Sequence, residues 1–253
     1  MAIAAFYDIH GNLPALEAVL AEAESLDPEM IVVGGDIASG PMPRETLERL
    51  SALGERALFI RGNADRELVR AFDERATADD DVWRRRARWN AEQITREQRD
   101  FLAELPEQLV LEVDALGPTL FCHGSPRSDE EIVTPGTTSE RLDEILARVE
   151  QRIVVIGHTH MQFDRRHGGV RIVNAGAVGM PYEGRPGAYW ALLGPDVDLR
   201  RTEYDFEAAA ELVRRSGYPE AEEHVRDLFL AQPSREEATQ FFERQAEDAP
   251  KRQ

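Results

Sequence analysis

Short apolar runs at residues 2–6, 30–33 and 57–60 alternate with segments of helical spacing in the first part of the chain. In the first of these segments Asn12 is placed to cap a helix whose leucines and valines recur every three or four residues. A second helical segment begins at Pro43. The order strand, helix, strand, helix, strand predicts a parallel sheet with short loops at one edge.

Residues 73–105 interrupt this alternation with a segment rich in arginine and helical in spacing. We interpret it as a helical insertion that could cap a site on the body of the protein. Trp83 and Trp89 would pack the insertion onto the body, because aromatic side chains mostly serve burial. The arginines favour a solvated face over a phosphate clamp.

The second half of the chain returns to strand patterns, and the glycine pair at 168–169 indicates that some of these strands are joined by short turns. A second sheet is therefore expected. From Asp205 to about residue 247 the spacing is helical, with breaks at glycine and proline. We expect one domain over residues 1–253 that ends in this helical extension. The predicted strands lie near 108–114, 119–122, 153–156, 170–174, 188–193 and 197–203, and a helix lies near 138–150.

Composition narrows the function. A formal net charge of −18 on 253 residues argues against general nucleic-acid binding and against an anionic membrane as a partner. No apolar run approaches the roughly 20 residues that a membrane span needs, and the N-terminus lacks the features of a signal peptide, so we expect a cytoplasmic protein. With one cysteine, Cys122, no intrachain disulfide can form, and the thiol is expected to be buried in a strand.

Polar side chains follow five of the predicted strands at the point where each strand ends. In an open α/β sheet this edge is where ligands bind. Carboxylates, imidazoles and an amide without thiolates suit divalent ions such as Mn²⁺, Fe²⁺ or Zn²⁺. The remaining histidines, His167 and His224, lie among charged residues and are interpreted as surface residues. The candidate metal ligands are Asp8, His10, Asp36, Asn63, His123, His158 and His160.

The order of these residues resembles the calcineurin-like metallophosphoesterases, whose pattern runs D-x-H, G-D, G-N-H-[DE], H and G-H-x-H. The segment at 174–179, Asn-Ala-Gly-Ala-Val-Gly, is similar to the N-P-G-S-V-G segment of a bacterial and archaeal branch that includes YfcE-type phosphodiesterases. The resemblance runs from Asp8 to about Leu193 and implies a two-sheet αββα sandwich. It further implies a hydrolase of small phosphoesters, in which a hydroxide bridging two metal ions attacks phosphorus.

Seven ligands suit two ions better than one tetrahedral ion, and the resemblance implies how they are shared. Asp36 would bridge both ions. We expect Mn²⁺ first, with Fe²⁺, Zn²⁺ or Ni²⁺ as alternatives. The spacing within 158–160, if extended, would place both imidazoles on one side, where each serves a different ion. Asp8, His10 and His160 would hold the first ion, and Asn63, His123 and His158 the second.

One position departs from the family pattern. Ala64 stands where the family has a histidine that is a candidate general acid, a function typically worth about 10²–10⁴-fold in rate. The departure favours phosphodiesters, or esters with acidic leaving groups. Asp36, Asn63 and Asp65 are the expected catalytic residues, although Asp65 would normally orient the missing histidine and could instead cap the next helix. A phosphomonoesterase or protein phosphatase, and a non-catalytic scaffold resembling the sorting-complex subunit Vps29, are the alternatives.

Three further side chains are candidates for substrate contact. Arg61 precedes Gly62 and could contact phosphate, or it could face outward at the end of its strand. Arg127 follows His123 in a loop, and Asn12 could touch the site as well as cap its helix. The physiological substrate stays open, and so does assembly into a homo-oligomer.

Overall fold

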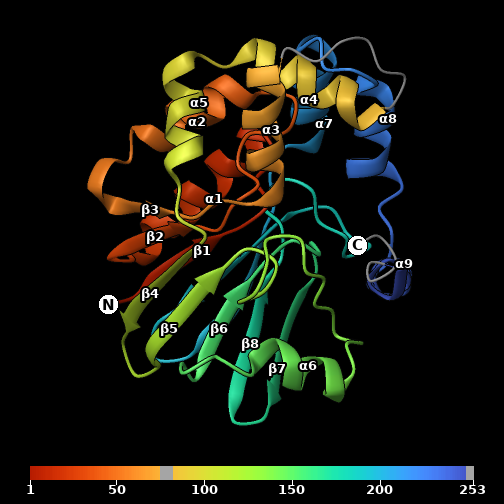
Figure 1. Ribbon diagram of the computed structural model, residues 1–253. Helices are drawn as coiled ribbons and strands as arrows, with labels where there is room; N and C mark the ends of the chain where they lie inside the picture. Colours follow the sequence, from red (N-terminus) through yellow and green to blue (C-terminus); the bar gives the residue numbers. More distant parts are fainter. Residues whose placement is uncertain (75–81, 249–253) are drawn as a thin grey trace.

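The computed structural model describes residues 1–74 and 82–248, and in it two five-stranded sheets pack face to face (Figure 1). The first sheet has the order β10-β9-β1-β2-β3 and consists of β1 (Ile3–Phe6), β2 (Met30–Val33), β3 (Ala57–Phe59), β9 (Ala188–Leu193) and β10 (Val197–Thr202). The second has the order β4-β5-β6-β8-β7 and consists of β4 (Gln108–Val113), β5 (Gly117–Cys122), β6 (Ile153–Ile156), β7 (Gln162–His167) and β8 (Val170–Ala175).

The layers follow from the alternation of side chains along each strand. In β1, Ile3 and Ala5 face the second sheet, whereas Ala4 and Phe6 face the helices on the other side. All four residues are buried, so this strand is apolar on both faces. The predicted two-sheet αββα sandwich is confirmed.

Helices cover both outer faces of the sandwich (Figure 1). Those on the first sheet close one apolar cluster with it, and α6 closes another with the second sheet. The Asn12 side chain accepts a hydrogen bond from the backbone N–H of Ala15, so the predicted cap is present. The helices of the body are α1 (Leu13–Leu26), α2 (Pro43–Ser51), the 3₁₀ turn η1 (Gly54–Arg56), α3 (Asn63–Glu74) and α6 (Ser139–Leu146).

The parallel strands run in register through the middle of each sheet. β1, β2 and β3 are parallel, as predicted, and β5, β6 and β8 form a second parallel set. The candidate metal ligands all follow the carboxyl ends of β1, β2, β3, β5 and β6. One edge of the sandwich therefore receives them all.

Strand β7 was not predicted. It pairs antiparallel with β8 through the turn at Gly168 and Gly169, and it forms the end of its sheet. Its sequence carries Asp164, Arg165 and Arg166 in succession, which lacks the apolar pattern of a buried strand. An edge strand tolerates such charges because half of its surface stays in water.

The insertion consists of two helices, α4 (Val82–Gln93) and α5 (Arg96–Glu104), and α4 packs against α3. The start of the predicted insertion at 75–81 and the side chain of Trp83 lie outside the described residues. Trp89 packs edge-on against Tyr218, with ring centroids 5.4 Å apart. The predicted role of Trp89 in packing is confirmed, but its aromatic partner belongs to the C-terminal extension.

The C-terminal extension is helical, as predicted (Figure 1), and the turn between its helices α7 and α8 contacts α4 through Tyr218 and Glu220. It contains α7 (Phe206–Arg215), α8 (Ala221–Val225), the π-helical turn η2 (Arg226–Leu230) and α9 (Arg235–Asp248). Over the described ranges, every helix is too short or too polar to cross a membrane.

Candidate metal centre and substrate cavity

The loops after the strands adopt an unusual backbone conformation at the candidate ligands. Asp8, His10, Asp36, His158 and His160 all have positive φ, between 47° and 66°. This left-handed region costs a non-glycine residue of order 1–3 kcal/mol and clusters at functional sites. It also corrects a prediction: the segment around Thr159 is not extended, so its two imidazoles are directed by turns rather than by strand alternation.

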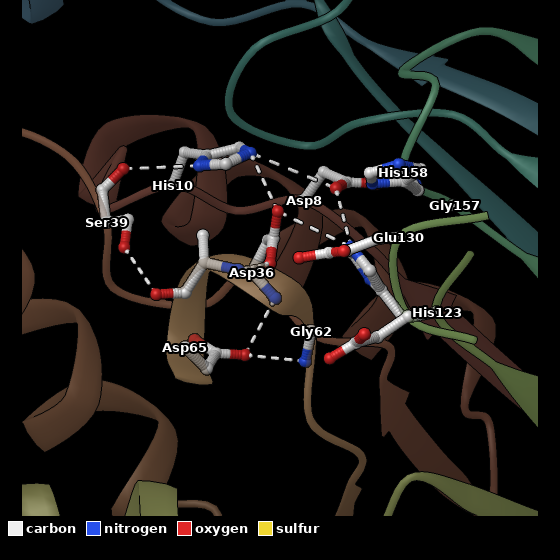
Figure 2. Close-up of polar contacts among 12 residues, drawn as sticks. Asp8, His10, Asp36, Ser39, Gly62, Asp65, His123, Glu130, Gly157 and His158 are labelled. Carbon is white, nitrogen blue, oxygen red and sulfur yellow. Dashed lines mark hydrogen bonds and ion pairs between the residues drawn. The ribbon is translucent and has the colours of Figure 1, made fainter. Parts of the chain in front are cut away.

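The carboxylates and imidazoles from four loops converge on one buried point (Figure 2). The Nε2 atom of His160 lies 3.2 Å from Asp8 Oδ1 and 3.2 Å from the Nε2 atom of His10. Asp36 Oδ2 lies 3.6 Å from His10 Nε2 and 3.4 Å from His123 Nε2. One ligand atom each from Asp8, His10, Asp36 and His160 falls within 4.8 Å of the others, so these four can hold one metal ion.

Backbone carbonyls fix the orientation of three of the imidazoles. The Nδ1 atom of His10 contacts the carbonyl of Ser39 at 3.2 Å, that of His123 contacts Gly34 at 2.8 Å, and that of His160 contacts Met180 at 2.6 Å. A carbonyl can only accept, so each Nδ1 donates its proton, and each Nε2 faces the cluster, where it can bind a metal ion once it is unprotonated. Histidines that bind metal are usually held in this way.

The second group of candidate ligands is less buried as a whole, because Asn63 and His158 are partly exposed whereas His123 is buried. The His123 and His158 rings lie 5.3 Å apart, and Asn63 is the first residue of α3. Asn63 and His158 both line the cavity described below. His158 is held through its backbone N–H, which donates to Asp8 Oδ2 at 2.9 Å.

Several ligand atoms lack a hydrogen-bond partner within the protein and could instead bind a cation. Among the described residues, the buried atoms without a hydrogen-bond partner include, besides several outside the site, Asp8 Oδ1, Asn63 Oδ1 and His123 Nε2. Buried polar atoms normally have a hydrogen-bond partner, and binding of an ion is a recognised reason for an exception. All three atoms belong to predicted ligands, so the residues present fit divalent metal ions.

The ionisable side chains of the cluster shift one another's pKa values. Burial raises the pKa of Asp36, but the imidazoles of His123 and His10 outweigh it and hold the pKa well below its usual value. Burial lowers the pKa of His123, yet the carboxylates of Asp36 and Asp8 raise it to about 10. Burial and the neighbouring His123 lower the pKa of His158 to about 4. The site thus favours an ion pair between the Asp36 carboxylate and the protonated His123, and a bound cation would displace the proton of His123.

Asp65 positions the loop of Asp36 and does not reach the cavity. Its Oδ2 accepts hydrogen bonds from the backbone N–H groups of Asp36 and Gly62, and its Oδ1 accepts from Ile37. Burial and the nearby Asp36 carboxylate raise the pKa of Asp65 to about 7. As a catalytic residue Asp65 can act only through Asp36, because it is fully buried and its oxygens are engaged.

Two of the glycines are required by close approach rather than by a turn. A Cβ on Gly62 would lie 2.2 Å from Asp36 Oδ1, and one on Gly157 would lie 2.5 Å from Asp8 Oδ2. Gly35 does have the left-handed conformation expected of it, at φ +92°. The glycines before the ligands therefore make room for the carboxylates as well as allowing turns.

A cavity of about 220 Å³ lies over the candidate ligands. The insertion and the C-terminal extension form its outer wall, as a cap would. Its lining includes five candidate ligands, with Ser39, Ala64, Glu67, Met180 and Tyr182 from the body, Arg86, Ala87 and Asn90 from α4, and Tyr218, His224 and Phe242 from the C-terminal extension.

The three candidates for substrate contact lie elsewhere. Arg61 donates to Glu107 at 2.6 Å, and Arg127 is ion-paired with Glu131. The amide of Asn12 donates to the carbonyl of Gly179 at 2.9 Å besides capping its helix. Arg61, Arg127 and Asn12 are absent from the lining of the cavity. Their contact with substrate stays a prediction.

The interpretation of His224 as a surface residue is wrong. It is 6% exposed and lines the cavity, because α8 folds over the site. Its local sequence is charged, so only the tertiary fold reveals its place. His167, in contrast, is partly exposed and its Nε2 lies 2.7 Å from Asp143. Cys122 is buried, as predicted.

The fold and this edge define a class of protein: an α/β sandwich with a buried cluster of carboxylates and imidazoles that can hold a metal ion. Residues 1–194 match the model of the calcineurin-like phosphoesterase superfamily domain, so the chain belongs to that family. The predicted family resemblance is confirmed.

Individual relatives agree with this assignment. A metallophosphoesterase crystal structure from Sphaerobacter thermophilus is 29% identical with a TM-score of 0.71, covering 87% of this chain and 96% of that one. The uncharacterized protein MJ0912 of Methanocaldococcus jannaschii is 26% identical, over 86% of this chain and 94% of its own. Phosphodiesterase YfcE of Escherichia coli is 25% identical, over 73% of this chain and 83% of its own.

Proposed function

We propose that this protein is a metal-dependent phosphodiesterase that acts on small phosphoesters with two divalent ions. Asp8, His10 and His160 would hold the first ion, and Asp36 would be shared. Asn63, His123 and His158 would hold the second. The observation that carries the proposal is the convergence of buried ligand atoms, several of them unpartnered within the described ranges, at one end of the cavity.

Bound divalent ions would supply a nucleophile from water at neutral pH and would neutralise charge on the phosphoryl oxygens. The chain's own contribution is to orient and to exclude water. The carbonyls of Ser39, Gly34 and Met180 hold the imidazoles, and Asp65 holds the loop that carries Asp36. A fixed ligand geometry needs no reorganisation during the reaction.

The preference for diesters is supported by Ala64, which lines the cavity where the family pattern has a histidine. A methyl group cannot protonate a leaving oxygen, so substrates with acidic leaving groups are favoured. The relative named Phosphodiesterase YfcE is consistent with this preference.

The size of the cavity favours a small substrate over a phosphoprotein. About 220 Å³ lies below the range of about 300–1,000 Å³ that is usual for drug-sized ligands. The covering helices leave little room for a folded protein chain to approach the ligands. The complete set of ligands likewise speaks against a scaffold without catalysis.

The test compares bis(4-nitrophenyl) phosphate with 4-nitrophenyl phosphate, because both release the same phenol. Chelator-treated protein is supplied separately with Mn²⁺, Ni²⁺, Zn²⁺ or Mg²⁺, and release of 4-nitrophenolate is followed. We expect metal-stimulated turnover with the higher kcat/KM on the diester. A clear preference for the monoester would refute diester specificity, and activity that survives metal removal would refute metal dependence.

A further inference from the structure

Part of the cavity lining comes from α4 and the C-terminal extension, which contribute no candidate metal ligand, and this part is called its second end. Arg86 reaches it from α4, and Tyr218 and His224 reach it from the C-terminal extension. Tyr182 lines the same cavity, and its ring stacks on His160 with centroids 4.8 Å apart and planes at 24°. The second end is therefore continuous with the metal site.

The guanidinium of Arg86 is held on two sides. Its central carbon lies over the Tyr218 ring, 5.4 Å from the centroid, and its Nε lies 3.7 Å from Glu220 Oε2. The Arg86 side chain is 14% exposed, so most of it is removed from water. Trp89 supports Tyr218 from the edge. A guanidinium held in this way is pre-organised for charge-assisted hydrogen bonds to a carboxylate or phosphate.

His224 adds a neutral donor to this end. Its ring packs against Tyr218, with centroids 5.1 Å apart. Burial, together with the charge of Arg86, lowers the pKa of His224 to about 3, so the imidazole is neutral near pH 7 and carries one N–H. A neutral imidazole is a poor general acid, so His224 does not replace the histidine missing at position 64.

The wall that α3 contributes disfavours an anion. Glu67 lines the cavity from α3, the helix that begins at the candidate ligand Asn63. A negatively charged group on the substrate is repelled by the Glu67 carboxylate and attracted to Arg86. The charges of the two walls thus orient such a group towards α4 and the C-terminal extension.

We propose that Arg86, with Tyr218 and His224, forms a subsite for an anionic group, a carboxylate or a second phosphate, carried on the substrate's non-reacting ester arm. This subsite rests on the proposed function, since it defines which small phosphodiesters the metal centre receives. Arg86 is then a specificity-determining residue.

The test uses three diesters with one leaving group, 4-nitrophenolate, and a second arm that is methyl, carboxymethyl or 2-phosphoethyl. Wild-type protein loaded with Mn²⁺ should have a higher kcat/KM on the carboxymethyl or phosphoethyl compound, and the better of the two identifies the anion. Arg86→Gln should lower kcat/KM on the preferred compound by about tenfold to a hundredfold and leave the methyl compound little changed. Arg86→Lys should restore part of the loss.

Two variants separate recognition from support of the fold. Glu220→Gln removes the ion pair but keeps Arg86, and Arg88→Gln makes the same change on the same helix at a residue outside the lining. Arg88→Gln should leave the preference for the anionic arm unchanged, and Glu220→Gln should keep it in part, because the Tyr218 ring still supports the guanidinium. Equal losses on all three compounds in Arg86→Gln, matched by Glu220→Gln, would make Arg86 structural and overturn the subsite. So would a wild-type enzyme that shows no preference.

Failure of the proposed function gives a different result. If no compound is hydrolysed with any metal, the phosphodiesterase proposal fails, and the same compounds become stable ligands for calorimetry. A tighter Kd for an anionic arm that Arg86→Gln abolishes would still support the subsite. Equal Kd values for the three compounds would overturn it.

Discussion

The metal-facing edge of the sandwich and the cover above it are built by different means. The edge takes its side chains from the ends of five buried strands, and several of these residues have strained, left-handed backbones. The cover takes its side chains from α4, from α8 and from the turn between α7 and α8, so Arg86, His224 and Tyr218 meet across long separations in sequence. On the proposed function, the comparison assigns the chemistry to the edge, where the surrounding loops fix the ligands, and the choice of substrate to the cover.

The largest effect is expected at the shared ligand. Asp36→Ala removes a carboxylate that lies 3.6 Å from His10 and 3.4 Å from His123. Activity should fall at least about 10³-fold, because both ions would lose a ligand. Turnover of bis(4-nitrophenyl) phosphate and metal content are the measurements. An unchanged rate would show that Asp36 is not a shared metal ligand and would contradict the comparison of edge and cover.

A smaller change in the edge tests its rigidity. The Cβ of Gly62→Ala would meet Asp36 Oδ1 at 2.2 Å, so the carboxylate must move. A displacement of about 1 Å can cost about 10²-fold in rate, and we expect a loss of kcat of that order. Gly194→Ala is the matched control, since its nearest contact would be Ala2 at 3.8 Å. Equal activities in the two variants would contradict a rigid edge.

Restoring the histidine of the family pattern should have a moderate effect. Ala64→His places a proton donor in the lining of the cavity, where general acids typically contribute about 10²–10⁴-fold. We expect only about tenfold, on esters with poorly acidic leaving groups, because Asp65 is engaged by backbone N–H groups and cannot orient the new imidazole. Rates on a series of aryl esters with leaving groups of different acidity measure this gain. A uniform gain on all leaving groups would exclude general acid catalysis as its cause.

The smallest effect is expected in the cover. His224→Phe keeps the ring contact with Tyr218 but removes one N–H donor from the cavity. One neutral hydrogen bond is worth about 1 kcal/mol, so KM for the preferred anionic diester should rise about fivefold. Metal content and kcat should stay as in the wild type. A loss of bound metal would show that cover and edge are not separate.

The same division explains what the sequence could predict. The ligands Asp8, Asp36 and His123 each follow an apolar run, and that signal is local. Parallel strands bring their ends to one edge, so the cluster could be predicted without knowing any distance. The turns that direct His158 and His160 could not be predicted, because positive φ at non-glycine residues is imposed by the surrounding loops.

The cover was predictable as a helical insertion that could cap the site and as a helical extension, but its side-chain contacts were not predictable. The charged sequence around His224 indicates a surface, and its burial depends on α8 folding over the cavity. The meeting of Trp89 with Tyr218 likewise depends on tertiary packing across more than a hundred residues. Strand β7 was missed for a related reason, since an edge strand with charges on both faces lacks the period of a half-buried strand.

The central claim is that the protein is a metal-dependent phosphodiesterase that binds two ions at the edge of the sandwich. The most direct measurement titrates Mn²⁺ into chelator-treated protein, with bound metal per chain by mass spectrometry and kcat on bis(4-nitrophenyl) phosphate recorded on the same samples. The account predicts that activity reaches its plateau as two ions per chain are bound. A plateau at one ion or fewer, or full activity without metal, would contradict it.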